Sequence, residues 1–228
     1  MTRTILVFFG PPGSGKGTQS DMLGDALNFP SISTGELLRR EQKTGSVLGR
    51  QAKRLMSSGK LVSETLIDHV LWARLARSDA QKGFMLDGYP RNEQQFKHLL
   101  KLLHGDDRLY FIEIEVSDKE VLRRLSGRRV CDCGASYHLK YNPPRKAGKC
   151  DLCGKAIYRR ADDEPSVIRR RLADYHSWVT PLLERASGRG SVIIIDGEQS
   201  ISGIQKQLRA RLKKFGVEPS KKKKKKTR

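Results

Sequence analysis

Gly10-Pro-Pro-Gly-Ser-Gly-Lys16-Gly-Thr18 stands directly after the apolar run Thr4–Phe9, and a helical pattern begins at Lys16. The apolar run is short and rich in β-formers, so it predicts a buried strand that ends in a glycine-rich loop. Backbone N–H groups in such a loop, together with the helix dipole, bind phosphate groups. Lys16 is placed to reach the β- and γ-phosphates of a nucleotide. The Walker A pattern has Ser or Thr directly after the lysine, whereas here Gly17 comes first and Thr18 follows.

Outward from this loop, short apolar runs alternate with helical patterns. Such alternation predicts an α/β fold, with a five-stranded parallel sheet, right-handed crossovers and helices on both faces. The predicted strands are Thr4–Phe9, Pro30–Ser33, Phe84–Leu86, Leu109–Val116 and Val192–Ile195. The predicted helices are Lys16–Leu27, Glu36–Lys43, Val47–Ser58, Glu64–Ser78, Asn92–Leu103, Lys119–Leu125, Pro165–Ala186 and Ile201–Phe215.

Two segments interrupt this alternation. Residues 33–62 are predicted as a helical insertion, and residues 127–163, which hold all four cysteines, as a small β-rich insertion. From Glu218 onward the sequence EPSKKKKKKTR predicts a disordered tail, because its like charges repel one another. The predicted division is a core of residues 1–32, 63–126 and 164–217, the two insertions, and a tail of residues 218–228.

The chain of 228 residues carries a formal net charge of +20. Without the last eight residues, 38 basic residues face 25 acidic ones, which leaves +13. This balance favours a polyanionic partner, namely a nucleotide, a nucleic acid or an anionic membrane. No apolar run reaches the roughly 18 to 20 residues that span a bilayer, and the start lacks a signal peptide's apolar region. We therefore expect a cytoplasmic protein without a membrane partner.

Cys131, Cys133, Cys150 and Cys153 are the only cysteines of the chain. Disulfides normally spread through a small secreted domain, whereas a cluster in a chain without a signal peptide favours a metal. Four thiolates suit a tetrahedral structural Zn²⁺, so all four cysteines are predicted as zinc ligands. Free thiols, a redox pair or another metal remain alternatives, and His138 is a conceivable substitute ligand.

Two further motifs each carry an arginine: STGELLR at 33–39 and LDGYPR at 86–91. Each arginine lies near the end of a predicted strand or early in a helix, where parallel α/β sheets open their ligand cleft. Two arginines from different segments can bind one phosphate through bidentate hydrogen bonds. Arg39 and Arg91 are therefore predicted to bind a second phosphate group near the loop.

Together, these motifs resemble the adenylate kinase family, in the type that has a long lid. The resemblance covers about residues 4–215 and rests on GPPGSGKGT, STGELLR, GKLV at 59–62, LDGYPRNEQQ, GRR at 127–129 and RRADDEPSVIRRRL at 159–172. It implies the P-loop nucleoside monophosphate kinase fold, with 33–62 as the AMP-binding insertion and 127–163 as the lid. Zinc-bearing lids of this family usually begin with C-x₂-C, and the C-x-C pair here is one residue shorter.

The resemblance also implies residue roles. The expected ATP-binding residues are Gly13, Ser14, Gly15, Lys16, Gly17, Thr18, Arg124, Arg128, Ser136, Tyr137 and Gln199. The expected AMP-binding residues are Thr34, Arg39, Lys60, Leu61, Val62, Gly88, Tyr89, Pro90, Arg91, Gln95, Arg160 and Arg171. The expected catalytic residues are Lys16, Arg39, Arg91, Arg128, Arg160 and Arg171. Asp87 matches the acid that holds Mg²⁺ through water, and Asp162 and Asp163 match acids that support the lid arginines.

The implied reaction is reversible phosphoryl transfer, MgATP + AMP ⇌ 2 ADP. The AMP phosphate is already an anionic nucleophile, so no general base is required, and none of the motifs carries an obvious catalytic His or Glu. Catalysis is expected from alignment and from charge neutralisation by Mg²⁺, Lys16 and the arginines. The two insertions are expected to close over the substrates and exclude water. The resemblance also favours a monomer.

Two alternatives stay open on the sequence alone. A UMP/CMP-type monophosphate kinase would share the fold, but Gln95, Thr34 and the long lid count against it. A nucleic-acid-binding protein could use the cysteine knuckle and the Lys-rich tail. Few aromatic residues stand near the knuckle for base stacking, so nucleic acid contact is expected only through the tail.

Overall fold

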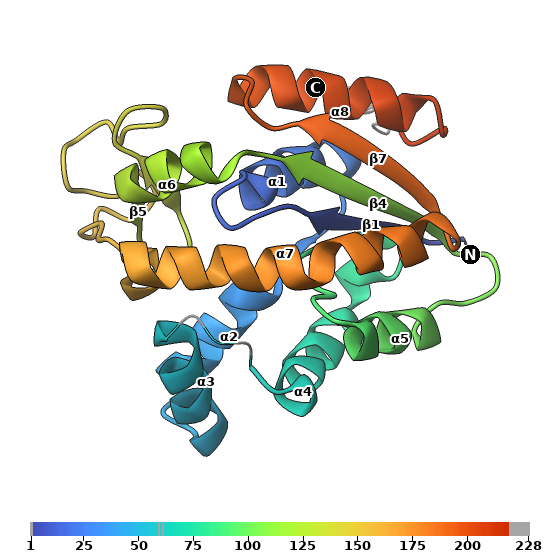
Figure 1. The fold of residues 1–228 in the computed structure, drawn as a ribbon, viewed down its shortest axis with the longest axis horizontal. Coiled ribbons are helices and arrows are strands. Elements are labelled where there is room, and N and C mark those ends of the chain that lie inside the picture. The colour runs from blue at the N-terminus through green and yellow to red at the C-terminus, as the bar shows by residue number, and fades with distance from the viewer. Residues whose placement is uncertain (1, 59, 61, 219–228) are drawn as a thin grey trace, which may run out of the picture.

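The computed structural model describes residues 2–58, 60 and 62–218. At its centre is a five-stranded sheet in the order β2-β3-β1-β4-β7 (Figure 1). The strands are β1 Thr4–Phe9, β2 Ser31–Ser33, β3 Gly83–Asp87, β4 Arg108–Glu115 and β7 Ser191–Asp196. All four pairings in the sheet are parallel. The predicted parallel α/β fold and its five strands are thereby confirmed.

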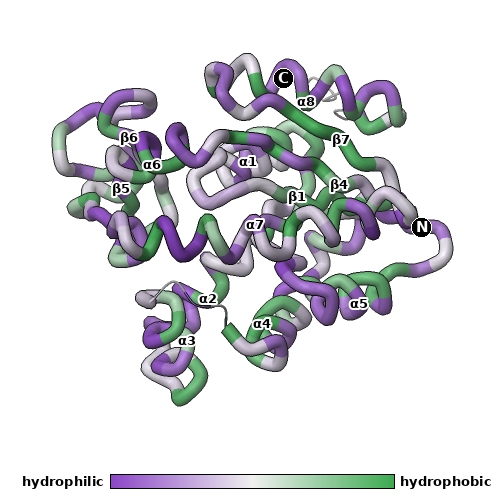
Figure 2. Tube along the Cα trace, viewed as in Figure 1, coloured by the Kyte–Doolittle hydropathy of each residue, from purple (hydrophilic) through white to green (hydrophobic). Residues whose placement is uncertain are grey.

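Strand β1 is buried on both faces because it lies in the middle of the sheet. Ile5, Val7 and Phe9 point into one apolar cluster, while Leu6 and Phe8 point into another. A nearly continuous apolar run is the pattern of a strand covered by helices on both sides. Figure 2 shows the same concentration of hydrophobic residues along the sheet.

Helices cover both faces of the sheet (Figure 1). The second cluster is built with α1 Lys16–Leu27 and α8 Ile201–Lys213, and the first with α4 Glu64–Leu75, α5 Glu93–Lys101 and α7 Pro165–Ser187. The remaining helices are α2 Thr34–Lys43, α3 Val47–Ser57 and α6 Asp118–Gly127, with short 3₁₀ helices η1 Ser78–Ala80 and η2 Ala161–Asp163. Among the residues that the structure describes, no helix combines the length and the apolar character needed to cross a membrane.

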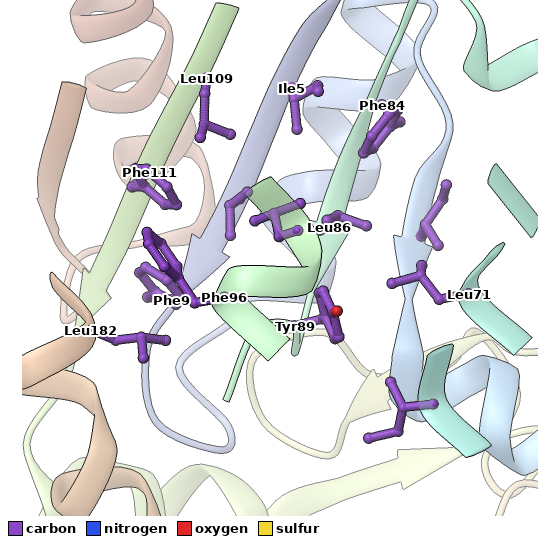
Figure 3. Packing of buried hydrophobic residues seen from close by; sticks show 14 of the residues in the cluster. Ile5, Phe9, Leu71, Phe84, Leu86, Tyr89, Phe96, Leu109, Phe111 and Leu182 are labelled. Carbon is purple, nitrogen blue, oxygen red and sulfur yellow. The ribbon is translucent and has the colours of Figure 1, made fainter. Parts of the chain in front are cut away.

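The first cluster fixes the position of α5, the helix that follows the LDGYPR motif. Phe96 of α5 packs on Phe111 of β4, which stacks on Phe9, with 5.8 Å between the ring centroids of each pair (Figure 3). Phe96 and Phe111 are both buried. Removing this apolar surface from water anchors the start of α5 against the sheet.

The predicted helix Glu64–Ser78 is three residues shorter in the structure. The pattern predicted a helix to Ser78, but α4 ends at Leu75. Arg77 has an extended backbone, and a separate 3₁₀ turn begins at Ser78. Arg74 donates two hydrogen bonds, of 2.9 and 2.7 Å, to the Asp79 carboxylate, so side chains from the two elements hold this corner together.

Residues 127–163 contain two short strands, β5 Arg128–Val130 and β6 Ser136–His138, paired antiparallel. Neither was predicted as a strand, because three residues are too few to show an alternating pattern. At the root of this segment, a Cβ atom on Gly127 would lie 2.5 Å from Nε2 of His138. Any other residue at position 127 would therefore require the His138 ring to move. The predicted disordered tail falls outside the described residues beyond Glu218.

Candidate active site

The loop between β1 and α1 has the backbone shape that anion binding requires. Gly13 and Gly15 have φ angles of 80° and 96°, in the left-handed region. A Cβ on Gly13 would lie 2.8 Å from side-chain atoms of Leu125. The cap position of α1 is Gly15, which offers no side chain to its first N–H groups, and the first turn holds no acid. These N–H groups can therefore bind an anion.

The Lys16 ammonium lies inside this loop. It donates hydrogen bonds of 2.8 Å to the carbonyl oxygens of both Gly10 and Pro11. Burial lowers the pKa of Lys16 to about 8, against the attraction of the nearby Asp87 carboxylate. A desolvated cation in this position gains most from a neighbouring phosphate.

A cleft of about 1300 Å³ opens over the loop. This volume exceeds the range of about 300 to 1,000 Å³ that is typical of small-molecule pockets, so it can hold more than one nucleotide-sized ligand. Every predicted ATP-binding residue lines it, as do Asp87, Arg39, Gly88, Pro90, Arg91, Arg160 and Arg171. Thr34, Lys60, Val62, Tyr89 and Gln95 do not line it. The predicted AMP-binding residue Leu61 lies outside the described residues.

Two neighbouring acids, Asp162 and Asp163, hold three of the arginines that line the cleft. Arg128 forms a bidentate pair with Asp163, with 2.8 Å between Nε and Oδ2. Arg160 pairs with Asp162 in the same way, with 2.7 Å between Nε and Oδ1. Arg171 reaches Asp162 Oδ2 at 3.1 Å. Although burial raises the pKa of Asp162, the charges of Arg160 and Arg171 outweigh it and leave that pKa well below its usual range.

The other two predicted catalytic arginines, Arg39 and Arg91, also line the cleft. Among the described residues, no ion pair is formed by Arg39 or Arg91. Burial lowers the pKa of Arg39 to about 10, an effect that the positive charge of Arg160 reinforces. Burial also lowers the pKa of Arg91, against the pull of Asp87 and Asp162. Two desolvated guanidinium groups without a paired acid favour an anionic ligand between them.

The loop after β3 is held by its own polar contacts. Thr34 Oγ1 donates to the Gly88 carbonyl at 2.9 Å, and Arg91 Nε donates to the same oxygen at 2.8 Å. The Arg91 N–H donates to Gln95 Oε1 at 2.8 Å. The other amide atom, Gln95 Nε2, is buried and has no partner among the described residues. A buried donor without an acceptor is costly, and a ligand could supply the missing acceptor.

On the donor side, Arg124 joins α6 to the turn that follows β7. Its Nε donates to Glu120 Oε1 at 2.7 Å, and its Nη2 donates to the Gly197 carbonyl, also at 2.7 Å. Gln199 lies in the same turn and donates to Asp196 at 3.2 Å. Sequence reasoning did not select Glu120, although its position four residues before Arg124 in a helix was a signal for this pair.

The Tyr137 side chain belongs to the cysteine cluster although the residue lines the cleft. It is buried with Cys131 and Cys150, and its hydroxyl lies 3.3 Å from Cys150 Sγ. The hydroxyl also accepts a hydrogen bond of 2.7 Å from the Asp151 N–H. Ser136, next to it, is exposed on β6.

The four cysteine sulfurs all lie within 4.8 Å of one another. The Cys131–Cys153 and Cys133–Cys150 sulfur pairs are 3.4 and 3.5 Å apart, and no disulfide joins them. A tetrahedral zinc ion with Zn–S bonds of about 2.3 Å requires sulfurs roughly 3.8 Å apart, so this donor set fits Zn²⁺. Despite the short C-x-C spacing, both of its thiols are therefore placed to bind the same zinc ion. His138 is not part of the cluster: its Nδ1 accepts the N–H groups of Lys140 and Tyr141 at 3.0 and 3.1 Å.

Comparison with known proteins places similar chains in one family. A family model described as adenylate kinase matches residues 8–190. A curated adenylate kinase from Methanocella arvoryzae is 43% identical over 213 residues, which cover 92% of this chain and 99% of the relative. Curated adenylate kinases from Methanosarcina barkeri and Caldicellulosiruptor bescii are each 39% identical, over 92% and 93% of this chain and 99% of each relative.

Proposed function

Because the chain belongs to the adenylate kinase family, we propose that its cleft carries out MgATP + AMP ⇌ 2 ADP through the residues of this site. Family membership makes it a nucleoside monophosphate kinase, a phosphotransferase whose substrates are ATP, AMP and ADP. The roles proposed for individual residues rest on one observation: Lys16 and arginines from several separate segments line the same cleft.

The donor nucleotide is assigned to the phosphate loop, Gly13 to Thr18. Its N–H groups and Lys16 would bind the phosphates, while Arg124, Arg128, Ser136, Tyr137 and Gln199 line the rest of that side. Adenylate kinases use Mg²⁺ with ATP. Asp87, at the carboxyl end of β3 beside Gly17, would hold that ion through water, and the ion would neutralise phosphate charge.

The acceptor is assigned to the loop after β3 and to the insertion. Arg39 and Arg91 would bind the AMP phosphate, and Gln95 Nε2 would donate to its adenine. The buried, unpartnered state of that amide nitrogen supports the base assignment. Thr34 would fix this loop through its hydrogen bond to the Gly88 carbonyl. Arg160 and Arg171, held by Asp162, would complete the charge around the transferring group.

Chemistry then depends on alignment and charge neutralisation. The AMP phosphate is itself an anionic nucleophile, so the chain needs no proton acceptor for the attack. We propose that residues 33–62 and 127–163 close over the two substrates and exclude water, which would otherwise accept the phosphoryl group. The four cysteines would bind a structural zinc ion that takes no part in the transfer. A monomeric state and a cytoplasmic location stay predictions from the sequence.

Initial rates with MgATP and AMP, GMP, CMP or UMP at equal concentration test the function. We expect a strong preference for AMP. Gln95→Ala is expected to raise the KM for AMP roughly tenfold and to weaken that preference, because one hydrogen bond to the base is lost. Gln81→Ala removes an exposed glutamine away from the cleft and serves as the matched control. A preference for a pyrimidine acceptor would contradict the base assignment.

A further inference from the structure

A buried tyrosine connects the acceptor loop to a carboxylate outside the cleft. Tyr89 belongs to the DGYPR segment, but its ring is only 1% exposed and packs in the first apolar cluster near Leu71 and Leu86 (Figure 3). Its hydroxyl donates to Asp68 Oδ1 on α4 at 3.2 Å. Burial and the neighbouring Asp68 charge raise the pKa of Tyr89, so the hydroxyl remains a donor.

The second oxygen of Asp68 binds the helix that follows the same loop. Oδ2 lies 2.6 Å from Nδ1 of His98 on α5, and both side chains are largely buried. The other ring nitrogen of His98 lies 2.9 Å from the amide nitrogen of Gln94. With Gln94 as the donor there, the proton of a neutral imidazole sits on Nδ1 and is donated to Asp68. Asp68 therefore joins the loop and α5 through one carboxylate.

A second carboxylate, one helical turn earlier on α4, binds the same region. Glu64 Oε1 accepts a hydrogen bond of 3.0 Å from Asn92 Nδ2. Asn92 Oδ1 in turn accepts the Gln95 N–H at 2.8 Å, and so caps α5. Gln95 Oε1 accepts the Arg91 N–H. A continuous series of hydrogen bonds thus runs from α4 to Arg91 and Gln95.

From the contacts of Asp68 with the Tyr89 hydroxyl and the His98 ring, we infer that Asp68 is a positioning residue for the acceptor nucleotide. The inference rests on the proposed function, which places AMP on Arg91 and Gln95. Asp68 does not line the cleft. Its effect is to hold the loop and α5 in the arrangement that binds AMP before the ligand arrives. Preorganisation of this kind strengthens binding by reducing the ordering that the ligand must impose.

Steady-state kinetics of Asp68→Asn, Tyr89→Phe and the double variant test the inference. Each single variant is expected to raise the KM for AMP roughly fivefold to tenfold, with the KM for ATP and kcat changed less than about twofold. Because both changes break the same contact, the double variant is expected to be no worse than the more impaired single variant. Asp79→Asn, which removes an exposed carboxylate near the end of α4, is the matched control.

Tyr89→Phe keeps the buried ring, so it reports on the hydroxyl even if Asp68→Asn folds poorly. An unchanged KM for AMP in Tyr89→Phe would overturn the inference, and so would equal losses for ATP and AMP. Gln95→Ala separates this failure from a failure of the proposed site. If Gln95→Ala raises the KM for AMP while Tyr89→Phe does not, the AMP site stands and the positioning role of Asp68 is wrong. If neither variant changes that KM, the AMP site itself is wrong.

Discussion

The Nζ atom of Lys43 lies 3.1 Å from Oδ1 of Asp132, and this pair joins the end of α2 to the cysteine knuckle. Asp132 stands between Cys131 and Cys133, and its Oδ1 also accepts a hydrogen bond of 2.9 Å from the Tyr158 hydroxyl. The residue inside the short C-x-C pair therefore forms a contact between the two predicted insertions, 33–62 and 127–163. Lys43 and Asp132 both line the cleft, so the contact joins the two segments across it.

Breaking this contact is expected to favour an open cleft only slightly. Both side chains are about half exposed, and exposed ion pairs are weak and screened by salt. Lys43→Met and Asp132→Asn should each raise the KM values for ATP and AMP less than about fivefold at low salt, with no difference from the wild type at about 0.5 M salt. Lys97→Met removes a similarly exposed ion pair on α5 and is the control. A salt-independent loss would show that the contact does not act through charge.

Lys16→Met is expected to affect activity and stability in opposite directions. Loss of the ammonium should lower kcat by about 10²-fold or more, since the ammonium neutralises phosphate charge during transfer. The substrate-free variant should be more stable than the wild type at pH 7, by at most roughly 3 kcal/mol, because the charged lysine is desolvated in the fold. Near-normal turnover would contradict the proposed mechanism.

The stability gain should depend on pH. Burial lowers the pKa of Lys16 from 10.5 to about 8 in the folded protein. Between these values the unfolded chain retains a proton that the folded protein has released, so the stability of the wild type rises with pH there. The advantage of Lys16→Met is therefore expected to shrink from pH 8 to pH 10.5, as measured by urea unfolding. A constant advantage across this window would contradict the assigned burial.

Asp163→Asn is expected to destabilise the fold by about 3 kcal/mol. The Asp163 side chain is fully buried and pairs with Arg128, and Arg171 lies 3.7 Å away. Removing one partner of a buried pair leaves an uncompensated charge. Urea unfolding at pH 7 measures the loss. Asp79→Asn breaks an ion pair whose acid is about half exposed and should cost less than about 1 kcal/mol. Equal losses in the two variants would argue against a special role for burial.

Zinc removal is expected to lower thermal stability and leave the phosphoryl-transfer chemistry intact. The lid has a small apolar cluster, Cys131, Tyr137 and Cys150 with two partly buried neighbours, so a metal would supply much of its stability. Elemental analysis of protein purified without chelator should find about one zinc per chain. A strong chelator should lower the Tm, and added zinc should restore it. Less than about 0.2 zinc per chain would contradict the assignment.

The sheet could be predicted from the sequence because most of its strands are short apolar runs that end at glycine-rich or polar loops. The phosphate loop was equally clear, since strand, glycines, Lys16 and helix follow one another without interruption. Both features are local in the chain. Hydrophobic periodicity is a property of a few neighbouring residues, so it is sufficient to predict such local elements.

The contacts between distant helices could not be predicted in this way. Sequence reasoning did not select Asp68 or His98 and assigned Tyr89 to AMP binding, because only the fold brings α4, α5 and the loop close enough for these contacts. The Lys43–Asp132 pair is 89 residues apart in the chain and depends on the cleft geometry. The two lid strands were missed because their hydrogen bonds, not their side chains, define them.

The contact between Gly127 and His138 restricts which residues can replace either of them during evolution. The space that a Cβ on residue 127 would need is filled by the imidazole of His138, at 2.5 Å from Nε2. A substitution at either position changes what the other can tolerate, so the two sites are expected to vary together among relatives. A relative with a side chain at the position of Gly127 should carry a smaller residue at the position of His138. Grafting a foreign lid onto this core would have to exchange both positions at once.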